Sequence, residues 1–181
     1  MIYFVALAVG GVSATIYHNY LLGNKIIPDE TVVGFNLIRT VDLSRERIFS
    51  VMADIEKYPK ILPQNFISVK IINQTDGIVG KVVFAEERVS EAGVITTLVV
   101  KHTIVPYQIH TVEIVGGDAN GTKIRADYRE IGSGTEITTD AQIHLHGILS
   151  PFGFLAQHNL EHATDTIITR FVEYAHNQTN V

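Results

Sequence analysis

The chain has 181 residues, 46% of them hydrophobic, and a formal net charge of −5. This length and hydrophobic content are enough for one domain with a full core. The 14 lysine and arginine residues are scattered along the chain, so the basic patch that nucleic-acid binding requires is missing, and no nucleic-acid partner is expected. With no cysteine, the chain has no disulfide, thiolate nucleophile or cysteine-ligated zinc.

The first 24 residues contain no Asp, Glu, Lys or Arg, and the run from Ile2 to Tyr17 is apolar or small throughout. This is close to the roughly 20 residues that a membrane-spanning helix requires. We therefore predict an apolar helix over 1–24 that anchors the protein in the membrane as a single pass, followed by a linker over 25–31. Lys25 is the only flanking basic residue, and the positive-inside rule then places the domain in the cytoplasm.

Two alternatives remain open for this N-terminal segment. The small residues Val12, Ser13 and Ala14 resemble a signal-peptide cleavage site, although the positively charged region that precedes such a site is absent. The segment is also consistent with an N-terminal helix that packs on its own domain and covers a cavity mouth.

The residues from Val41 to Pro63 predict the end of a strand, a capped helix and a second helix broken by proline. Ser44 is placed to cap the first helix with its hydroxyl, and Glu46 adds negative charge at the positive helix end. The expected apolar stripe of this segment consists of Ile48, Met52 and Ile55.

This segment resembles the opening of the START-like superfamily, also called SRPBCC or helix-grip, and the sequence ADIEKYP carries most of the resemblance. The matching features are a strand ending at Val41, a capped helix from Ser44 to Ala53 and an acidic-x-x-Tyr-Pro turn from Asp54 to Pro59. The superfamily includes polyketide cyclases/dehydrases and coenzyme Q-binding START proteins. The resemblance extends weakly over 33–175 and implies an α+β helix-grip fold that binds apolar molecules, without identifying a catalytic motif.

Alternating apolar residues separated by turn signals predict about seven antiparallel strands in a meander. We expect them at 32–41, 66–73, 78–90, 94–104, 107–115, 122–131 and 135–145. A long helix is predicted from Pro151 to about Ala175. Its sheet-facing stripe would be Ala156, Leu160, Ala163, Ile167, Phe171 and Tyr174. The START-like domain is expected over 32–177, with a short tail over 178–181.

Many of the predicted inward-facing strand residues are small or medium in size, which admits a cavity between the sheet and the last helix. His102 and Tyr128 are the polar side chains expected there, placed to orient a ligand carbonyl or hydroxyl; the alternative is that each is an ordinary buried residue with satisfied hydrogen bonds. The candidate ligand-binding residues are Leu98, Val100, His102, Val112, Ala126, Tyr128, Leu160 and Ile167.

No metal site and no cofactor are expected. His144 and His146 share one strand face, and His158 and His162 lie four apart on the last helix. Strand and helix periodicity points both pairs outward, on elements whose bodies would separate them. Structural metal sites normally use about four ligands, so we predict surface histidines.

The sequence therefore predicts a membrane-tethered protein that binds or carries a hydrophobic small molecule or lipid, with binding favoured over catalysis. The resemblance to the coenzyme Q-binding group, in Asp54 to Pro63 and in Pro106 to Gly117, makes an isoprenoid quinone a candidate ligand. One alternative is a cyclase/dehydrase-like enzyme in which His102 or Tyr128 acts as acid or base, although no catalytic residue is assigned. Another is a protein-interaction module without a ligand. Ligand identity, topology and oligomeric state are not specified by the sequence.

Overall fold

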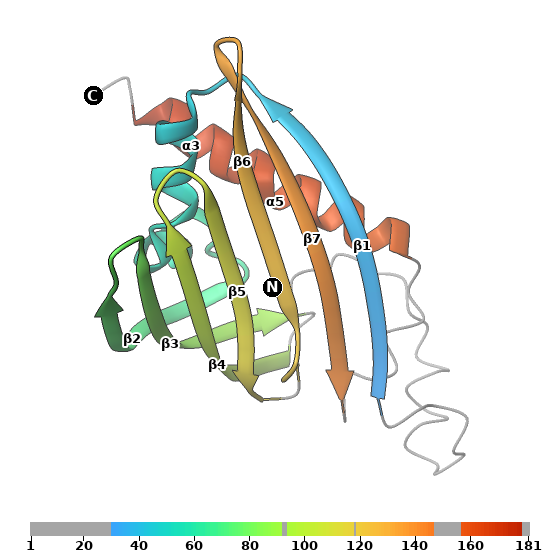
Figure 1. Ribbon diagram of the computed structural model, residues 1–181. Helices are drawn as coiled ribbons and strands as arrows, with labels where there is room; N and C mark the ends of the chain where they lie inside the picture. Colours follow the sequence, from blue (N-terminus) through green and yellow to red (C-terminus); the bar gives the residue numbers. More distant parts are fainter. Residues whose placement is uncertain (1–29, 92–93, 118, 147–156, 179–181) are drawn as a thin grey trace.

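The computed structural model describes residues 30–91, 94–117, 119–146 and 157–178, and within these ranges an antiparallel sheet and a long helix dominate (Figure 1). The strands are β1 (Glu30–Val41), β2 (Phe66–Asp76), β3 (Lys81–Glu91), β4 (Val94–Val105), β5 (Ile109–Gly116), β6 (Lys123–Ile131) and β7 (Gly134–His146). The helices are α3 (Arg45–Met52), α4 (Tyr58–Ile61) and α5 (Gln157–Asn177), with a 3-10 turn, η1, at Ile55–Lys57. The predicted α+β class and seven strands are confirmed.

The sheet order is β1-β7-β6-β5-β4-β3-β2, and every neighbouring pair is antiparallel. From β2 to β7 the chain forms consecutive hairpins, whereas β1 crosses to the far edge and pairs with β7. Register shifts interrupt β2 twice and the β4–β5 pairing once. Such bulges bend and twist a strand, and Figure 1 shows the resulting sheet curving around α5.

The short helices α3 and α4 fill the connection between β1 and β2, at the end of the sheet where the C-terminal end of α5 lies (Figure 1). The predicted helix after Ser44 is confirmed, but the hydroxyl of Ser44 makes no capping hydrogen bond. The backbone carbonyl of Ser44 instead accepts from the amides of Arg47 and Ile48. Arg47 also donates to the backbone carbonyl of Ala175, which joins α3 to the end of α5.

Helix α5 packs its apolar face against the concave side of the sheet. Leu160, Ala163 and Phe171 are buried as predicted, while Ile167 and Tyr174 are only half-buried. The buried stripe is shifted slightly, because the inward positions also include Thr164, Ile168 and Ala175. An ion pair of 2.6 Å between Arg39 on β1 and Asp165 connects the helix to the edge of the sheet.

The predicted N-terminal helix over 1–24, the linker residues up to 29, the stretch from Pro151 to Ala156 and most of the C-terminal tail lie outside the described residues. Strand β1 begins at Glu30, two residues before the expected domain start. Within the part of the chain that the structure describes, no helix combines the length and hydropathy needed to cross a bilayer.

Candidate ligand-binding site

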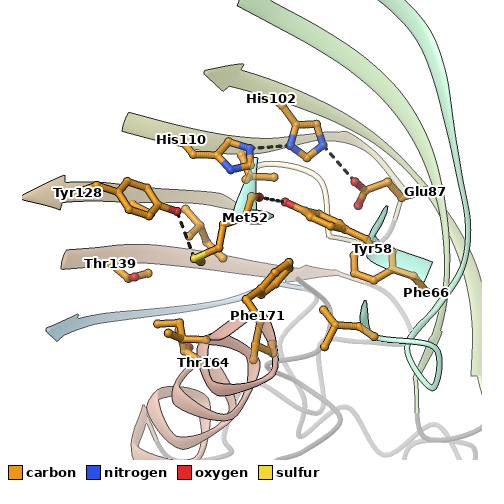
Figure 2. Close-up of a pocket in the computed structure, with 16 residues that line it drawn as sticks. Met52, Tyr58, Phe66, Glu87, His102, His110, Tyr128, Thr139, Thr164 and Phe171 are labelled. Carbon is orange, nitrogen blue, oxygen red and sulfur yellow. Dashed lines mark hydrogen bonds and ion pairs between the residues drawn. The ribbon is translucent and has the colours of Figure 1, made fainter. Parts of the chain in front are cut away.

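A cavity of about 110 Å³ lies between the concave face of the sheet and α5, closed at one end by α3 and α4 (Figure 2). Its walls are mostly aliphatic and aromatic, with a few polar side chains from β3, β4, β5, β7 and α5. The lining residues are Met52, Tyr58, Leu62, Phe66, Glu87, His102, His110, Val112, Ile124, Ala126, Tyr128, Thr139, Thr164, Ile167, Ile168 and Phe171.

The structure brings five of the eight predicted candidates to this cavity: His102, Val112, Ala126, Tyr128 and Ile167. The other three, Leu98, Val100 and Leu160, are buried at 1%, 1% and 2% exposure, but they do not line it. They were expected in the cavity because strand and helix periodicity points them inward. At these three positions the inward side chain packs against other core residues and does not border the cavity.

The polar side of the cavity is a chain of three buried side chains from three neighbouring strands, Glu87 on β3, His102 on β4 and His110 on β5. Nε2 of His102 lies 3.1 Å from Oε1 of Glu87, and Nδ1 of His102 lies 3.1 Å from Nε2 of His110. Figure 2 shows the three side chains in a row along one side of the cavity.

The bonding pattern constrains where the protons are. Burial, reinforced by the neighbouring His102, lowers the pKa of His110 to about 3, so its imidazole is neutral at physiological pH. Nε2 of His110 faces Nδ1 of His102, and Nε2 of His102 faces Glu87, so the three groups form one hydrogen-bonded chain that can run in two directions. In one direction Nε2–H of His110 donates to Nδ1 of His102, and Nε2–H of His102 donates to the carboxyl group of Glu87. In the other, the carboxyl group donates to Nε2 of His102, and Nδ1–H of His102 donates to Nε2 of His110.

Two tyrosines stand near this polar chain. The hydroxyl of Tyr58 donates to the Met52 carbonyl at 2.8 Å, and the hydroxyl of Tyr128 lies 3.5 Å from the Met52 sulfur. Burial raises the pKa of both phenols above the ordinary value, with the charge of Glu87 a smaller cause for Tyr58 and that of Asp127 for Tyr128. Both are therefore neutral hydrogen-bond donors and not phenolate bases near neutral pH.

Hydrogen-bonding capacity remains at two positions of the cavity wall. Among the described residues none bonds to the second carboxyl oxygen of Glu87, since its bond to His102 uses Oε1. The hydroxyl of Thr139, on the β7 side of the cavity, likewise has no protein partner within the described ranges. The site thus combines an apolar body with a small number of polar groups able to bind a ligand carbonyl or hydroxyl, which is the usual composition of a small-molecule pocket.

Sequence reasoning missed Glu87 and His110 as site residues. Each has a signal in the sequence, which is its position on the inward face of a strand. Glu87 shares that face with the buried Val83, Ala85 and Val89, and His110 shares it with Val112. An ionisable residue on the apolar face of a strand needs a buried partner. The partners themselves come from neighbouring strands, and only the strand pairing shows that they meet.

The surface histidines are placed as predicted within the described residues. His144 and His146 point to the outer face of β7, away from the cavity, and His162 is exposed on α5. The side chain of His158 lies outside the described residues.

No protein-family model and no curated protein sequence matches the chain. Solved structures do match it over most of its length. The chain is similar to the protein TTHA0849 from Thermus thermophilus, with a TM-score of 0.68 and 12% identity over 82% of this chain and 100% of that one.

Two further solved structures are informative about the architecture. The Zhui aromatase/cyclase from Streptomyces sp. R1128 aligns with a TM-score of 0.61 and 13% identity, covering 83% of this chain and 97% of that one. A START superfamily protein from Mycobacterium smegmatis aligns with a TM-score of 0.61 and 19% identity, covering 80% and 99%. At these identities the likeness concerns architecture. The curved seven-stranded sheet closed by a C-terminal helix, together with these neighbours, shows that the chain has the START-like (SRPBCC) helix-grip fold.

Proposed function

We propose that the protein binds and carries an apolar small molecule that contains a ring and at least one carbonyl or hydroxyl group. The observation that carries this proposal is the cavity between α5 and the sheet, whose apolar walls surround the buried Glu87, His102 and His110. Burial of apolar ligand surface supplies the affinity, at roughly 25 cal/mol per Å². The polar groups supply orientation and selectivity.

The size of the cavity supports a ring as the buried part of the ligand. Its volume of about 110 Å³ is of the same order as the roughly 150 Å³ engineered cavity that binds benzene. A long lipid chain does not fit within such a volume. The ring of a quinone does, and its carbonyl oxygens match the hydroxyl donors of Thr139 and Tyr128.

The proposal includes a membrane tether. Its support is the composition of residues 1–24, which contain no Asp, Glu, Lys or Arg. A tether raises the local concentration of the binding domain at the source of an apolar ligand. After extraction of membranes at alkaline pH, a tethered chain stays in the pellet, whereas release of the full chain into the supernatant contradicts the tether.

Native mass spectrometry of the full chain, combined with organic extraction, tests the binding function. The protein is purified in detergent from cells that contain membrane lipids, and 1,4-naphthoquinone and palmitate are then added separately as probes. We expect one stoichiometric apolar ligand after purification, or uptake of one naphthoquinone by the empty protein. A chain that carries no ligand and takes up neither probe contradicts a carrier and favours an interaction module.

Acid–base catalysis on the bound molecule is a second candidate function. It is favoured by the hydrogen-bonded chain of Glu87, His102 and His110, because ionisable groups bonded in this way can deliver or remove a proton at a substrate. Three of the structural neighbours are aromatase/cyclases. If the chain is an enzyme of that kind, His102→Gln abolishes turnover of a polyketide precursor while leaving naphthoquinone uptake in place; a carrier shows no turnover in either form.

A further inference from the structure

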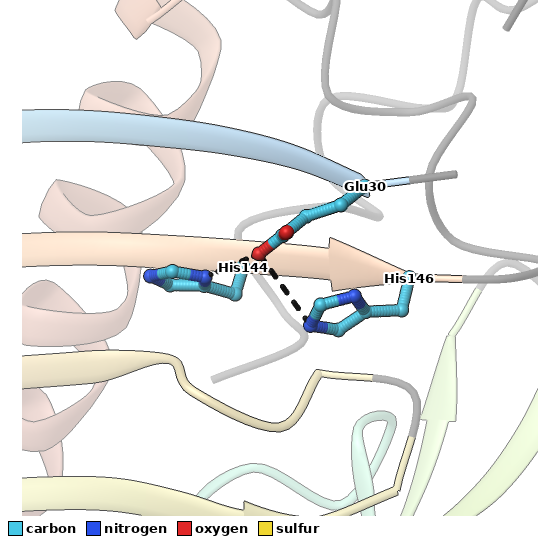
Figure 3. Close-up of side chains that lie close together, drawn as sticks. All are labelled: Glu30, His144 and His146. Atoms are coloured by element: carbon cyan, nitrogen blue, oxygen red, sulfur yellow. Dashed lines mark hydrogen bonds and ion pairs between the residues drawn. The ribbon is translucent and has the colours of Figure 1, made fainter. Parts of the chain in front are cut away.

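The outer face of the sheet carries a cluster of three potential metal ligands, Glu30, His144 and His146 (Figure 3). His144 and His146 are two residues apart on β7 and so share a face. In the β1–β7 register Glu30 lies directly opposite His146. The sequence alone places Glu30 in the expected linker, away from the histidines. The strand pairing makes it the third member of the cluster.

The spacing of the donor atoms suits a single ion. Oε1 of Glu30 lies 2.8 Å from Nδ1 of His144 and 3.8 Å from Nε2 of His146, and the three donor atoms all lie within 4.8 Å of one another. With zinc–ligand distances of about 2.1 Å, two ligand atoms of a tetrahedral site are roughly 3.4 Å apart. One ion fits among these three atoms after small side-chain rotations.

The turn between β5 and β6 holds both imidazole rings in place. Gly121, at a φ of +92°, lets the backbone approach the ring of His144 so closely that an added Cβ would lie 3.2 Å from its Cγ. Thr122 accepts a hydrogen bond from the amide of His144 at 2.8 Å and donates to its carbonyl at 3.1 Å. The carbonyl oxygen of Asn120 lies 2.9 Å from Nε2 of His146 and accepts its N–H, a bond that is replaced when this nitrogen loses its proton and binds an ion. Support of this kind orients metal ligands before the ion binds.

We propose that Glu30, His144 and His146 bind one divalent transition-metal ion, Zn²⁺ in particular, with a coordination position open to solvent. Two imidazoles and one carboxylate are a known ligand set of open zinc sites. Imidazole donors favour Zn²⁺ over Ca²⁺ and Mg²⁺, which require several oxygen ligands. The three side chains are 27–48% exposed, so an ion reaches them from solvent. The site lies on the face of the sheet opposite the cavity and does not depend on the proposed ligand binding.

Isothermal titration of the full chain with ZnCl₂ tests the site, using chelator-treated protein without a polyhistidine tag. We expect one tight equivalent of zinc in the wild type, at least tenfold weaker binding in Glu30→Gln, and loss of that equivalent in a double variant carrying His144→Gln and His146→Gln. His162→Gln is the matched control. It removes an exposed histidine from α5, where His158 and His162 have the i, i+4 spacing of a possible helical chelate, and it leaves the tight equivalent unchanged.

Zinc K-edge X-ray absorption of the wild-type complex gives an answer that does not depend on whether the variants fold. Two imidazole ligands together with oxygen donors support the site, and a spectrum with fewer than two imidazoles overturns it. In the titration, a wild type that binds zinc less than tenfold more tightly than the double variant overturns it as well. So does a loss of affinity in His162→Gln as large as that in the double variant.

Discussion

Oε1 of Glu87 and Nε2 of His102 lie 3.1 Å apart, with both side chains buried between the sheet and α5. Nδ1 of the same imidazole lies 3.1 Å from Nε2 of His110, so Glu87, His102 and His110 form one buried chain of hydrogen bonds. Buried ionisable groups need such partners, so we expect the bond between Glu87 and His102 to stabilise the fold.

A comparison of Glu87→Gln with Glu87→Ala tests this arrangement. The glutamine side chain offers either an amide donor or a carbonyl acceptor to Nε2 of His102, so its cost in unfolding free energy is expected to be about 1 kcal/mol or less. Alanine leaves a buried ring nitrogen without a partner and costs about 1–3 kcal/mol. Urea denaturation at pH 7 measures both. A loss of about 3 kcal/mol or more in Glu87→Gln would contradict a bond that a neutral side chain can replace.

His110 makes the stability of the fold depend on pH. Its pKa is lowered from 6.5 to about 3, so above pH 6.5 the imidazole is neutral in both the folded and the unfolded chain. As the pH falls from 6.5 toward 3, the unfolded chain gains a proton that the folded chain does not bind. Stability is therefore lost at up to about 1.4 kcal/mol per pH unit.

His110→Gln removes this contribution and should lose less stability than the wild type when urea denaturation at pH 4.5 is compared with pH 7. Carboxylates titrate in both proteins, so the difference between the two slopes isolates the imidazole. Equal slopes would show that His110 is protonated in the folded state.

The two tyrosines beside Met52 should differ in energetic importance. Tyr58→Phe removes a 2.8 Å hydrogen bond to a backbone carbonyl and should cost about 0.5–1.5 kcal/mol of unfolding free energy. Tyr128→Phe removes a 3.5 Å contact to a thioether, which is a weak acceptor, and should cost less than the Tyr58 substitution. Thermal unfolding of the two variants measures the difference. A larger loss for Tyr128→Phe would mean that its hydroxyl has a stronger partner than the sulfur.

Filling the cavity should separate binding from stability. Ala126 lines the cavity, so Ala126→Leu places extra side-chain volume in empty space and should leave the unfolding free energy nearly unchanged while abolishing naphthoquinone uptake. Ala141 is the matched control, because it is buried at 4% exposure on the neighbouring strand but does not line the cavity. Ala141→Leu should cost about 1–3 kcal/mol by overpacking. Equal destabilisation of the two variants would mean that the space beside Ala126 is already filled.

The seven strands and the helix-grip architecture could be predicted because their signals are local or are carried by the resemblance around ADIEKYP. Alternation and glycine turns placed every strand to within a few residues. Strand β1 differs from the others, because the sequence does not show where this strand begins. Its extension to Glu30 depends on pairing with His146, a contact over more than a hundred residues that no local pattern reports.

The site was predictable only in part. Ala126, His102 and Tyr128 were found because side-chain alternation identifies the inward face of a strand. Leu98 and Val100 show the limit of that rule, since it identifies inward residues but not which of them border empty space. The relay also depends on cross-strand distances, so Glu87 and His110 became visible as partners of His102 only in three dimensions.

Methyl NMR of Met52 tests the central claim most directly. The chain has two methionines, and Met52 lines the cavity, so selective ¹³C-methyl labelling gives a signal from the cavity wall that Met52→Leu assigns. Titration of the full chain with 1,4-naphthoquinone should shift the Met52 signal to saturation at one equivalent, with no shift of that signal in Ala126→Leu. A Met52 signal that stays in place in the wild type, or that moves equally in Ala126→Leu, would contradict ligand binding between α5 and the sheet.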